Sequence, residues 1–276
     1  MMIVDHQLHK ETKPEKTAHD NGAARNIAKV LETFDALSLE ESQGVKLMKR
    51  TDTKFVFAES LLPKLLVDLA QDYYVLDVDG LRMQHYKTRY YDTPDFEFYH
   101  QHHNGQRDRF KLRVRSYLDT DHDFLEVKQK DNHNRTKKSR LPSDEETTTV
   151  SPEVQSFLDA TLPANEAIFV PKIVNSFFRI SLVSKVDKER LTIDFDIHFL
   201  SPTTQFTLPG IAIAEVKQPQ FSIQSAFIQR MRQENRRPTS FSKYCVGVAL
   251  AYPHLKRNKF KPLLLNIQKF ILGEHN

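Results

Sequence analysis

The chain has 276 residues, of which 39% are hydrophobic and 28% are charged, and its formal net charge is +4. This excess is smaller than dedicated nucleic-acid-binding proteins carry, so the placement of the charges is more informative than their sum. The single cysteine, Cys245, excludes an internal disulfide, and no apolar run approaches the ~18 residues of a transmembrane helix. The N-terminus also lacks the apolar core of a signal peptide. These features favour a cytoplasmic protein without a membrane span.

The spacing of apolar residues alternates along the chain between the helical period and the period of two that is typical of strands. In the first half it predicts a helix at 26–39, a strand at 49–57, a helix from about Ser60, two strands within 73–91 joined by a turn at Asp79-Gly80, a short helix ending near Asn104-Gly105, and strands at 109–117 and 123–130. In the second half it predicts a basic polar segment at 130–140, a helix after Pro152, strands at 171–184, 190–199 and 211–218, and helices at 222–235, 242–250 and 263–271. We expect a disordered tail at 1–24, one folded domain at 25–252 and a basic helical tail at 253–276.

Charged side chains occupy alternate positions of several predicted strands. Because residues two apart share one face of a strand, the four cations within 109–115 face away from Phe110, Leu112 and Val114. The charged faces of the four strands carry Arg109, Lys111, Arg113 and Arg115; Glu126, Lys128 and Lys130; Arg190, Asp194 and Asp196; and Glu215 and Lys217.

An antiparallel sheet with one solvated face would explain any single strand of this kind. Four like charges on one face repel one another, however, and an anionic ligand would offset that repulsion. We therefore expect an α+β fold in which a closed antiparallel β-barrel has its charges inside and its helices packed outside. Lys and Arg facing inward suit a chain of phosphates, and the few carboxylates would pair with them or hold a divalent metal.

Seven segments, in this order, resemble the VTC domain: LMKRTDTKFVF, TRYYDT, KLRVRSY, FLEVKQK, RLTIDFD, IAEVKQ and SFSKYCVGVA. The resemblance as a whole covers the chain from about Phe34 to Ala251. VTC domains are the catalytic domains of polyphosphate polymerases and are related to the CYTH, or triphosphate-tunnel, fold. Eukaryotic members carry phosphate-sensing and transmembrane modules that this chain lacks, so it resembles the stand-alone bacterial forms.

The resemblance implies a role for individual residues of the tunnel. It implies catalytic roles for Lys54, Arg113, Arg115 and Lys243. It also implies that Glu215 coordinates Mn²⁺ or Mg²⁺. The same resemblance implies phosphate binding by Lys54, Arg113, Arg115, Lys128, Lys130, Arg179, Arg190, Lys217, Ser242 and Lys243. Two positions depart from the family pattern: Phe177 replaces a tyrosine, and Ser240 stands where a member carries a further lysine.

The activity that the resemblance implies is ATP-driven polyphosphate synthesis. The basic wall would hold the triphosphate, and the terminal phosphate of a growing chain would attack the γ-phosphorus and release ADP. Phosphoryl transfer depends mostly on positioning and charge neutralisation, so it needs no Ser-His-Asp arrangement. The chain also has no Walker-type loop, which argues against an ordinary P-loop kinase.

Two alternatives keep the same fold. A triphosphatase would carry a Glu-x-Glu-x-Lys pattern on the first strand, whereas this chain has Arg50-Thr51-Asp52-Thr53-Lys54, with a single carboxylate. Fewer metal-binding acids make activation of water harder, which favours the polymerase. A protein that binds phosphate chains without catalysis is the second alternative.

Four other features have an ordinary explanation that we favour over a functional one. Tyr86, Tyr90 and Tyr91 could stack on nucleic-acid bases, but core packing explains them better and no nucleic-acid partner is expected. His100, His102 and His103 suit a solvated loop better than a metal site. The run Arg135–Arg140 suits a solvated loop better than an approach to the tunnel mouth, and the helix at 263–271 is expected to dock on the outside of the barrel.

Overall fold

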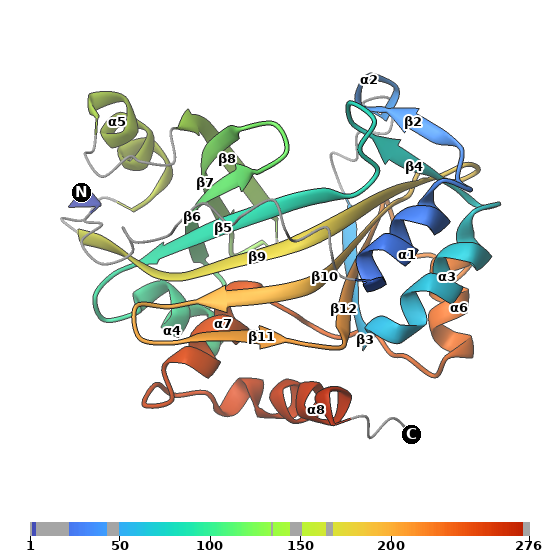
Figure 1. Ribbon diagram of the computed structural model, residues 1–276. Helices are drawn as coiled ribbons and strands as arrows, with labels where there is room; N and C mark the ends of the chain where they lie inside the picture. Colours follow the sequence, from blue (N-terminus) through green and yellow to red (C-terminus); the bar gives the residue numbers. More distant parts are fainter. Residues whose placement is uncertain are drawn as a thin grey trace.

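One large, mostly antiparallel sheet with helices on both faces forms the fold in the computed structural model (Figure 1). The described residues are 2–3, 22–42, 50–133, 135–143, 151–163 and 168–272. The strands are β1 (Met2–Ile3), β2 (Ala36–Ser38), β3 (Thr51–Ala58), β4 (Tyr73–Asp77), β5 (Gln84–Asp92), β6 (Arg109–Tyr117), β7 (His122–Lys130), β8 (Thr136–Ser143), β9 (Ile168–Ser184), β10 (Arg190–Leu200), β11 (Gln205–Leu208) and β12 (Ile211–Gln218). The helices are α1 (Gly22–Leu31), α2 (Leu39–Ser42), α3 (Leu62–Leu69), α4 (Glu97–Asn104), α5 (Pro152–Thr161), α6 (Ala226–Gln233), α7 (Lys243–Ala251) and α8 (Lys261–Ile271), with 3-10 turns at η3 (Glu59–Leu61) and η4 (Asn258–Phe260).

The sheet is not a closed barrel, which corrects the prediction from the sequence. Its strands follow the order β3-β12-β10-β9-β5-β6-β7-β8, so that β3 and β8 are its two ends. Neighbours along this path are antiparallel, whereas β1 with β9 and β2 with β4 are parallel pairs. Strand β8 suits an edge because Lys137 is exposed on it and Pro142 has no N–H to donate to a further strand. The fold class is α+β with a curved, open sheet.

Helices α1, α3 and α6 cover the outer face of β3, β12 and β10. Phe55 and Phe57 of β3 pack against Phe227 of α6, with ring centroids 5.6 and 6.4 Å apart. Figure 1 shows the three helices side by side on this face. The apolar side of β6, formed by Phe110, Leu112 and Val114, packs in a separate core with α5, as the alternation predicts.

The concave face of the sheet is charged in one half and apolar in the other. The change runs from Lys54 to Val56 on β3, from Glu215 to Ile213 on β12 and from Arg179 to Phe177 on β9. Helix α7, which is buried from Tyr244 to Ala249, packs against the apolar half together with α4 and α8. One end of the concavity is therefore filled by α7, and the other end is lined by charges.

Several element boundaries differ from those predicted. The helix predicted at 26–39 ends at Leu31, because a turn follows it and Phe34 joins the same core from a loop. Of the tail predicted as disordered, Met2–Ile3 pairs with β9 and α1 begins at Gly22, while most of the rest lies outside the described residues. The helix predicted from Ser60 begins at Leu62 after a 3-10 turn.

Two further corrections concern β8 and β10. The basic segment predicted without structure contains β8, which pairs with β7 in register from Lys130 opposite Thr136. In β10 a bulge between Phe195 and His198 breaks the alternation, and Asp196 has a φ of 51°. Asp196 consequently pairs with His198, at 2.8 Å, and lies outside the row that contains Asp194.

The short helix predicted before Asn104-Gly105 is confirmed as α4, and Gly105 ends it with a φ of 71°. Helix α8 packs against the same apolar core as α7 through Ile267 and Phe270, which are buried, and not on the outer face of the sheet as the sequence predicts. Within the described parts of the chain, the apolar stretches of helix are too short to cross a bilayer.

Gly247 sets how closely α7 approaches the sheet. A Cβ at this position would lie 2.8 Å from the Phe199 ring and 3.1 Å from Ile173. We expect Gly247→Ala to lower the free energy of unfolding by ~1–3 kcal/mol, although alanine favours helices. Urea denaturation measures this change. The matched control is Gly22→Ala at the start of α1, where a Cβ meets nothing within 4 Å; equal stability of the two variants would contradict the close packing.

Candidate functional site

The charged half of the concave face encloses a cavity of about 740 Å³. Strands from both ends of the sheet contribute to it, because β3 and β12 curve round to face β6, β7 and β8 across the cavity. Of the residues that the sequence points to, the cavity brings together Lys54, Arg113, Arg115, Lys128, Arg179, Glu215, Lys217, Ser242 and Lys243.

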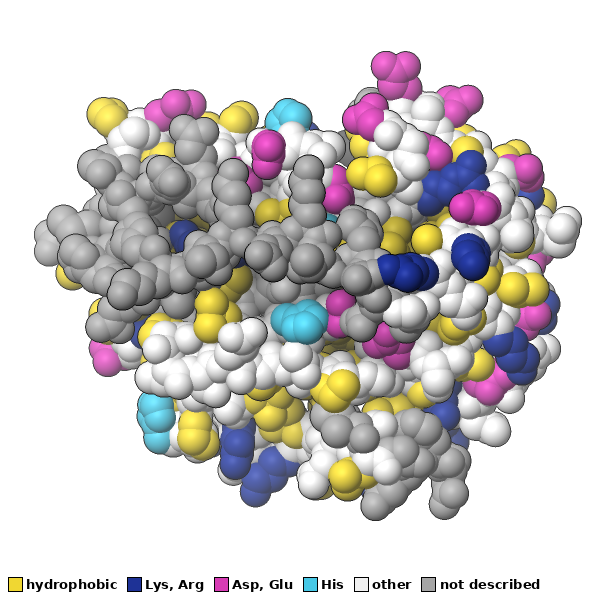
Figure 2. Space-filling model, in the orientation of Figure 1, with side chains coloured by type: hydrophobic (Ala, Val, Ile, Leu, Met, Phe, Trp, Pro, Cys, Tyr) yellow, Lys and Arg dark blue, Asp and Glu magenta, His cyan; other side chains and the backbone are white. Residues whose placement is uncertain are grey.

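Positive charge is concentrated in this cavity rather than spread over the protein. Its Lys and Arg residues are Arg50, Lys54, Lys111, Arg113, Arg115, Lys128, Arg135, Lys138, Arg179, Lys217 and Lys243, and its carboxylates are Asp52, Asp194 and Glu215. Eleven cations against three anions give the lining a formal charge of +8. Because the whole chain has a net charge of +4, the residues outside the lining together carry −4. On the described part of the face in Figure 2, Lys and Arg lie scattered among Asp and Glu. A polyanion would therefore be drawn to the cavity.

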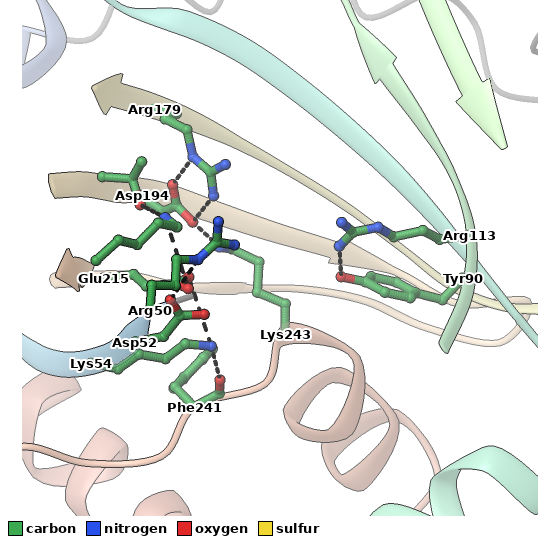
Figure 3. Close-up of polar contacts among 12 residues, drawn as sticks. Arg50, Asp52, Lys54, Tyr90, Arg113, Arg179, Asp194, Glu215, Phe241 and Lys243 are labelled. Carbon is green, nitrogen blue, oxygen red and sulfur yellow. Dashed lines mark hydrogen bonds and ion pairs between the residues drawn. The ribbon is translucent and has the colours of Figure 1, made fainter. Parts of the chain in front are cut away.

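Asp194 fixes two of the cations. Arg179 donates to both of its carboxylate oxygens, from Nε at 2.6 Å and from Nη2 at 2.8 Å, and Lys243 also contacts it (Figure 3). Burial acts to raise the pKa of Asp194, but Arg179 and Lys243 outweigh it and hold that pKa well below its usual range. Asp194 thus stays charged and presents Arg179 and Lys243 in fixed positions.

Glu126 plays the same part on the opposite wall. It is 1% exposed and accepts hydrogen bonds from Arg113, whose Nε lies 2.8 Å away, while Arg115 lies at 3.9 Å and Lys138 makes a further contact. Burial would raise its pKa, but the three cations lower it to about 2. Arg113 also donates to the Tyr90 hydroxyl at 3.3 Å, which fixes its guanidinium from a second side (Figure 3).

Glu215 is held more loosely than these two carboxylates. It lies opposite Lys54 across β3 and β12, with Lys54 Nζ at 3.9 Å and Lys217 Nζ at 3.8 Å, and it faces the cavity. Lys54 donates its hydrogen bond to the Phe241 carbonyl instead, at 2.9 Å (Figure 3). Burial opposes ionisation, but the charges of Lys217 and Lys54 prevail and lower the pKa of Glu215. Its oxygens are ionised and open to a ligand.

Several lysines in the cavity are surrounded by too few anions. Burial and the charge of Lys111 lower the pKa of Lys128 to about 7, and Lys54 and Arg113 also contribute. Burial and neighbouring cations lower the pKa of Lys111 to about 8. The pKa of Lys243 also falls to about 8, through burial and Arg179, although Asp194 opposes this shift. Such values mark sites at which an added anion is stabilising.

The N-terminus of α7 supplies a further positive element. Ser242 caps the helix by accepting a hydrogen bond from the Cys245 N–H at 3.3 Å, and Phe241, Ser242 and Lys243 line the cavity. The partial positive charge of a helix N-terminus adds to that of Lys243. Phe177, which departs from the family pattern, packs under these groups, with Lys243 Nζ 3.9 Å from its ring centroid.

Two residues that the resemblance implied lie outside the cavity lining. Arg190 donates to the Ser42 carbonyl near the start of β10, and Lys130 lies opposite Arg109 at the end of β7. Ser240, the other departure from the family pattern, is exposed and also lies outside the lining.

Cations on β8 and just before β3 also line the cavity, although no site role was predicted for them. Arg135 and Lys138 line the cavity from the β8 side, and Arg50 lines it beside Asp52. No apolar alternation marks β8 in the sequence, because the residues from Thr136 to Arg140 are all polar. Lys111 also lines the cavity, although the resemblance assigned it no role.

The tyrosines pack in the core, as predicted, but the prediction of a solvated loop is wrong for the histidines: they lie on α4, where His103 is buried. His102 is half-buried and contacts the Phe110 carbonyl at 3.2 Å. Burial, with the charges of Lys111 and Arg109, lowers its pKa to about 2. Among the described residues no three His, Cys, Asp or Glu side chains are grouped to hold a metal by themselves. Tyr86 and Tyr90 are buried and pack against Phe177 and Tyr244.

Comparisons with known proteins give one family. The VTC domain model matches residues 49–252. No curated protein matches the chain at a significant level.

Three solved structures have low similarity to the chain. A candidate adenylate cyclase from Bacillus halodurans has 14% identity and a TM-score of 0.45, covering 71% of this chain and 96% of its own. A candidate adenylyl cyclase from Hippeastrum, described as having a dominant triphosphatase activity, has 12% identity and a TM-score of 0.44, covering 72% and 96%. A protein from Pyrococcus horikoshii has 11% identity and a TM-score of 0.39, covering 73% and 98%. Similarity at this level carries no information on what this chain binds.

The crowding of cations predicts that the ligand-free protein gains stability when one is removed. The pKa of Lys128 is about 7 when folded against an ordinary 10.5, so the unfolded chain binds the proton more tightly. Stability should therefore rise as the pH increases from about 7 towards 10. At about pH 6, Lys128→Gln should raise the free energy of unfolding by ~1–3 kcal/mol and flatten this pH dependence.

Chemical denaturation across this pH range measures both effects. Lys137→Gln, which changes an exposed lysine on the neighbouring strand, is the control and should shift stability by less than ~0.5 kcal/mol. A destabilising effect of Lys128→Gln would show that Lys128 supports the fold rather than a ligand.

Proposed function

Because the chain belongs to the VTC domain family, we propose that it is a metal-dependent phosphotransferase that lengthens polyphosphate with the γ-phosphate of ATP. The observation that carries this proposal is the convergence of eleven cations on one enclosed cavity that also holds an ionised, loosely paired carboxylate. Neither solubility nor folding calls for such a concentration of like charge. A chain of phosphates would neutralise it.

Three arginines would bind the phosphate oxygens. Arg113, Arg115 and Arg179 approach the cavity from β6 and β9, and Glu126 and Asp194 already hold their guanidinium groups. A guanidinium that is fixed before the substrate arrives loses little entropy on binding, and its planar fork matches two phosphate oxygens. Lysines such as Lys54 and Lys128 would add mobile point charges between them.

Glu215 is the carboxylate best suited to a divalent metal. Asp194 and Glu126 have short contacts to cations, and Asp52 accepts from Arg50 at 3.0 Å, whereas the cations beside Glu215 lie at 3.8–3.9 Å. Mg²⁺ is usually held by one or two carboxylates plus substrate phosphates, rather than by a cage of protein ligands. The donor set therefore fits Mn²⁺ or Mg²⁺ bound jointly by Glu215 and phosphate. Such an ion would neutralise charge on the transferred group.

The residues of the cavity would position two anionic reactants against each other. An oxygen of the acceptor's terminal phosphate forms a bond to the γ-phosphorus, the bond to the β,γ-bridging oxygen breaks, and ADP leaves. The attacking oxygen is already ionised, so no general base is needed. Arg113, Arg179 and Lys243 lower the repulsion between the two phosphates and stabilise the charge on the transferred group.

Hydrolysis by the same cavity is less well supported. Water must be activated before it attacks, which usually takes further carboxylates near the metal. Asp52, the acid on the first strand, accepts a hydrogen bond from Arg50 at 3.0 Å. Transfer to an anionic acceptor needs only the positive field that the cavity has.

With ATP and Mn²⁺, the purified protein should make phosphate polymers that a gel resolves. Glu215→Gln should reduce this synthesis by about a hundredfold or more, because it removes the anionic ligand without changing the size of the side chain. Glu153→Gln, at an exposed position of α5, is the matched control and should keep full activity.

The same assay separates the alternatives. Release of orthophosphate without polymer would identify a triphosphatase and overturn the transfer reaction. Phosphate binding detected by calorimetry, without any turnover, would identify a protein that binds phosphate chains without catalysis. Full activity of the Glu215→Gln variant would show that Glu215 is not a ligand of the metal.

A further inference from the structure

The inner end of the cavity is closed, and two of the three polar side chains next to it, those of Thr88 and Asn175, are uncharged. The concave face turns apolar at Val56, Ile213 and Phe177, and α7 fills the space beyond them. At this boundary the lining of β5 is formed by Thr88, which lies two residues from Tyr90 on the same face. A molecule entering the cavity therefore meets Thr88 near the point where the polar surface ends.

Three polar side chains lie side by side in this place across three strands. Thr88 on β5 is opposite Arg115 on β6 and opposite Asn175 on β9. Residues opposite each other in antiparallel strands share one face of the sheet, so all three are on the cavity side. Thr88 and Asn175 are each 1% exposed.

These three side chains hold polar atoms that have no hydrogen-bond partner among the described residues. They are the Thr88 hydroxyl and both the oxygen and the nitrogen of the Asn175 amide. Nε of Arg115 also lacks a hydrogen bond, although the Glu126 carboxylate lies 3.9 Å from it. Buried polar groups in proteins are paired in the large majority of cases, because an unpaired one destabilises the fold. Several unpaired groups beside one another, at the edge of a cationic cavity, indicate a ligand that supplies the missing partners.

We propose that Thr88, supported by Asn175 and Arg115, forms a subsite for the terminal phosphate group of a linear phosphate chain. This inference rests on the proposed function, in that the cavity takes phosphate chains. Thr88 would donate its hydroxyl hydrogen to a phosphate oxygen, as Arg115 does through Nε. Asn175 is a positioning residue, which orients the Thr88 hydroxyl or reaches the phosphate through one water.

The closed end and the uncharged groups both select the terminal phosphate. Only the end of a chain can reach a cavity floor that α7 blocks. A terminal phosphate also has an oxygen that takes up a proton with a pKa of ≈ 6, whereas an internal phosphate has none. An amide offers both an acceptor for that proton and donors for the other oxygens, which a lysine or arginine cannot do.

Linear tripolyphosphate and cyclic trimetaphosphate, titrated into the full chain by calorimetry, test the proposal. The cyclic compound has three phosphates but no terminal group. Thr88→Val, which keeps the branched shape and removes the hydroxyl, should weaken binding of the linear compound about tenfold. It should leave binding of the cyclic compound within about twofold. Thr88→Ser, which keeps the hydroxyl, should bind the linear compound almost as the wild type does.

Thermal denaturation without ligand separates binding from folding. Because Thr88→Val and Asn175→Leu remove unpaired buried polar atoms, both variants should unfold at the wild-type temperature or above it. Asn175→Leu should also weaken binding of the linear compound and spare the cyclic one.

Each remaining outcome has a definite meaning. Unchanged binding of the linear compound by Thr88→Val, or equal loss for both compounds, would overturn the terminal-phosphate subsite while leaving the proposed function intact. If wild-type protein bound neither compound, the proposed function itself would fail, and the subsite with it.

Discussion

Repulsion among cations in a confined space is the constraint on which the rest of this structure depends. Two buried carboxylates, Glu126 and Asp194, reduce this repulsion by pairing with the arginines of opposite walls. They do not neutralise it, because eleven cations face three carboxylates in the lining. Burial, together with the charge of neighbouring cations such as Lys111, lowers the pKa of Lys128 to about 7. The folded chain is therefore less stable than it would be without this excess of positive charge, which an anionic ligand would neutralise.

Helix α7 joins the two halves of the concave face. Its body packs in the apolar half, where Gly247 allows close approach to Phe199, and its N-terminus presents Ser242 and Lys243 to the charged half. A shift of this helix would therefore change the core and the site together. Tyr244 ties it to the rest of the fold by donating a hydrogen bond to Asp92, a buried carboxylate that also accepts from the backbone N–H groups of Phe98 and Tyr99.

The sequence predicted the inward face of β6 correctly because a period of two has one structural meaning in an antiparallel strand. It could not show that the sheet stays open, since this depends on β8, a strand of Lys, Ser and Arg with few apolar residues to reveal it. The alternation in the sequence placed Asp196 on the wrong face, because Asp196 has a positive φ at a bulge in β10. No glycine or other residue type at this position indicates the bulge. Arg190 followed the same alternation, yet it lies at the start of β10, where its side chain reaches the Ser42 carbonyl instead. The unpaired atoms of Asn175 depend on strand order and could not be foreseen.

A crystal structure of the full chain with linear tripolyphosphate tests most directly whether the cationic cavity binds a phosphate chain. We predict phosphate density inside the cavity, with oxygens in contact with Arg113, Arg179 and Lys243 and the chain end directed at Thr88. Density that lies only on the outer surface, or an empty cavity in crystals of protein that binds the compound in solution, would contradict this prediction.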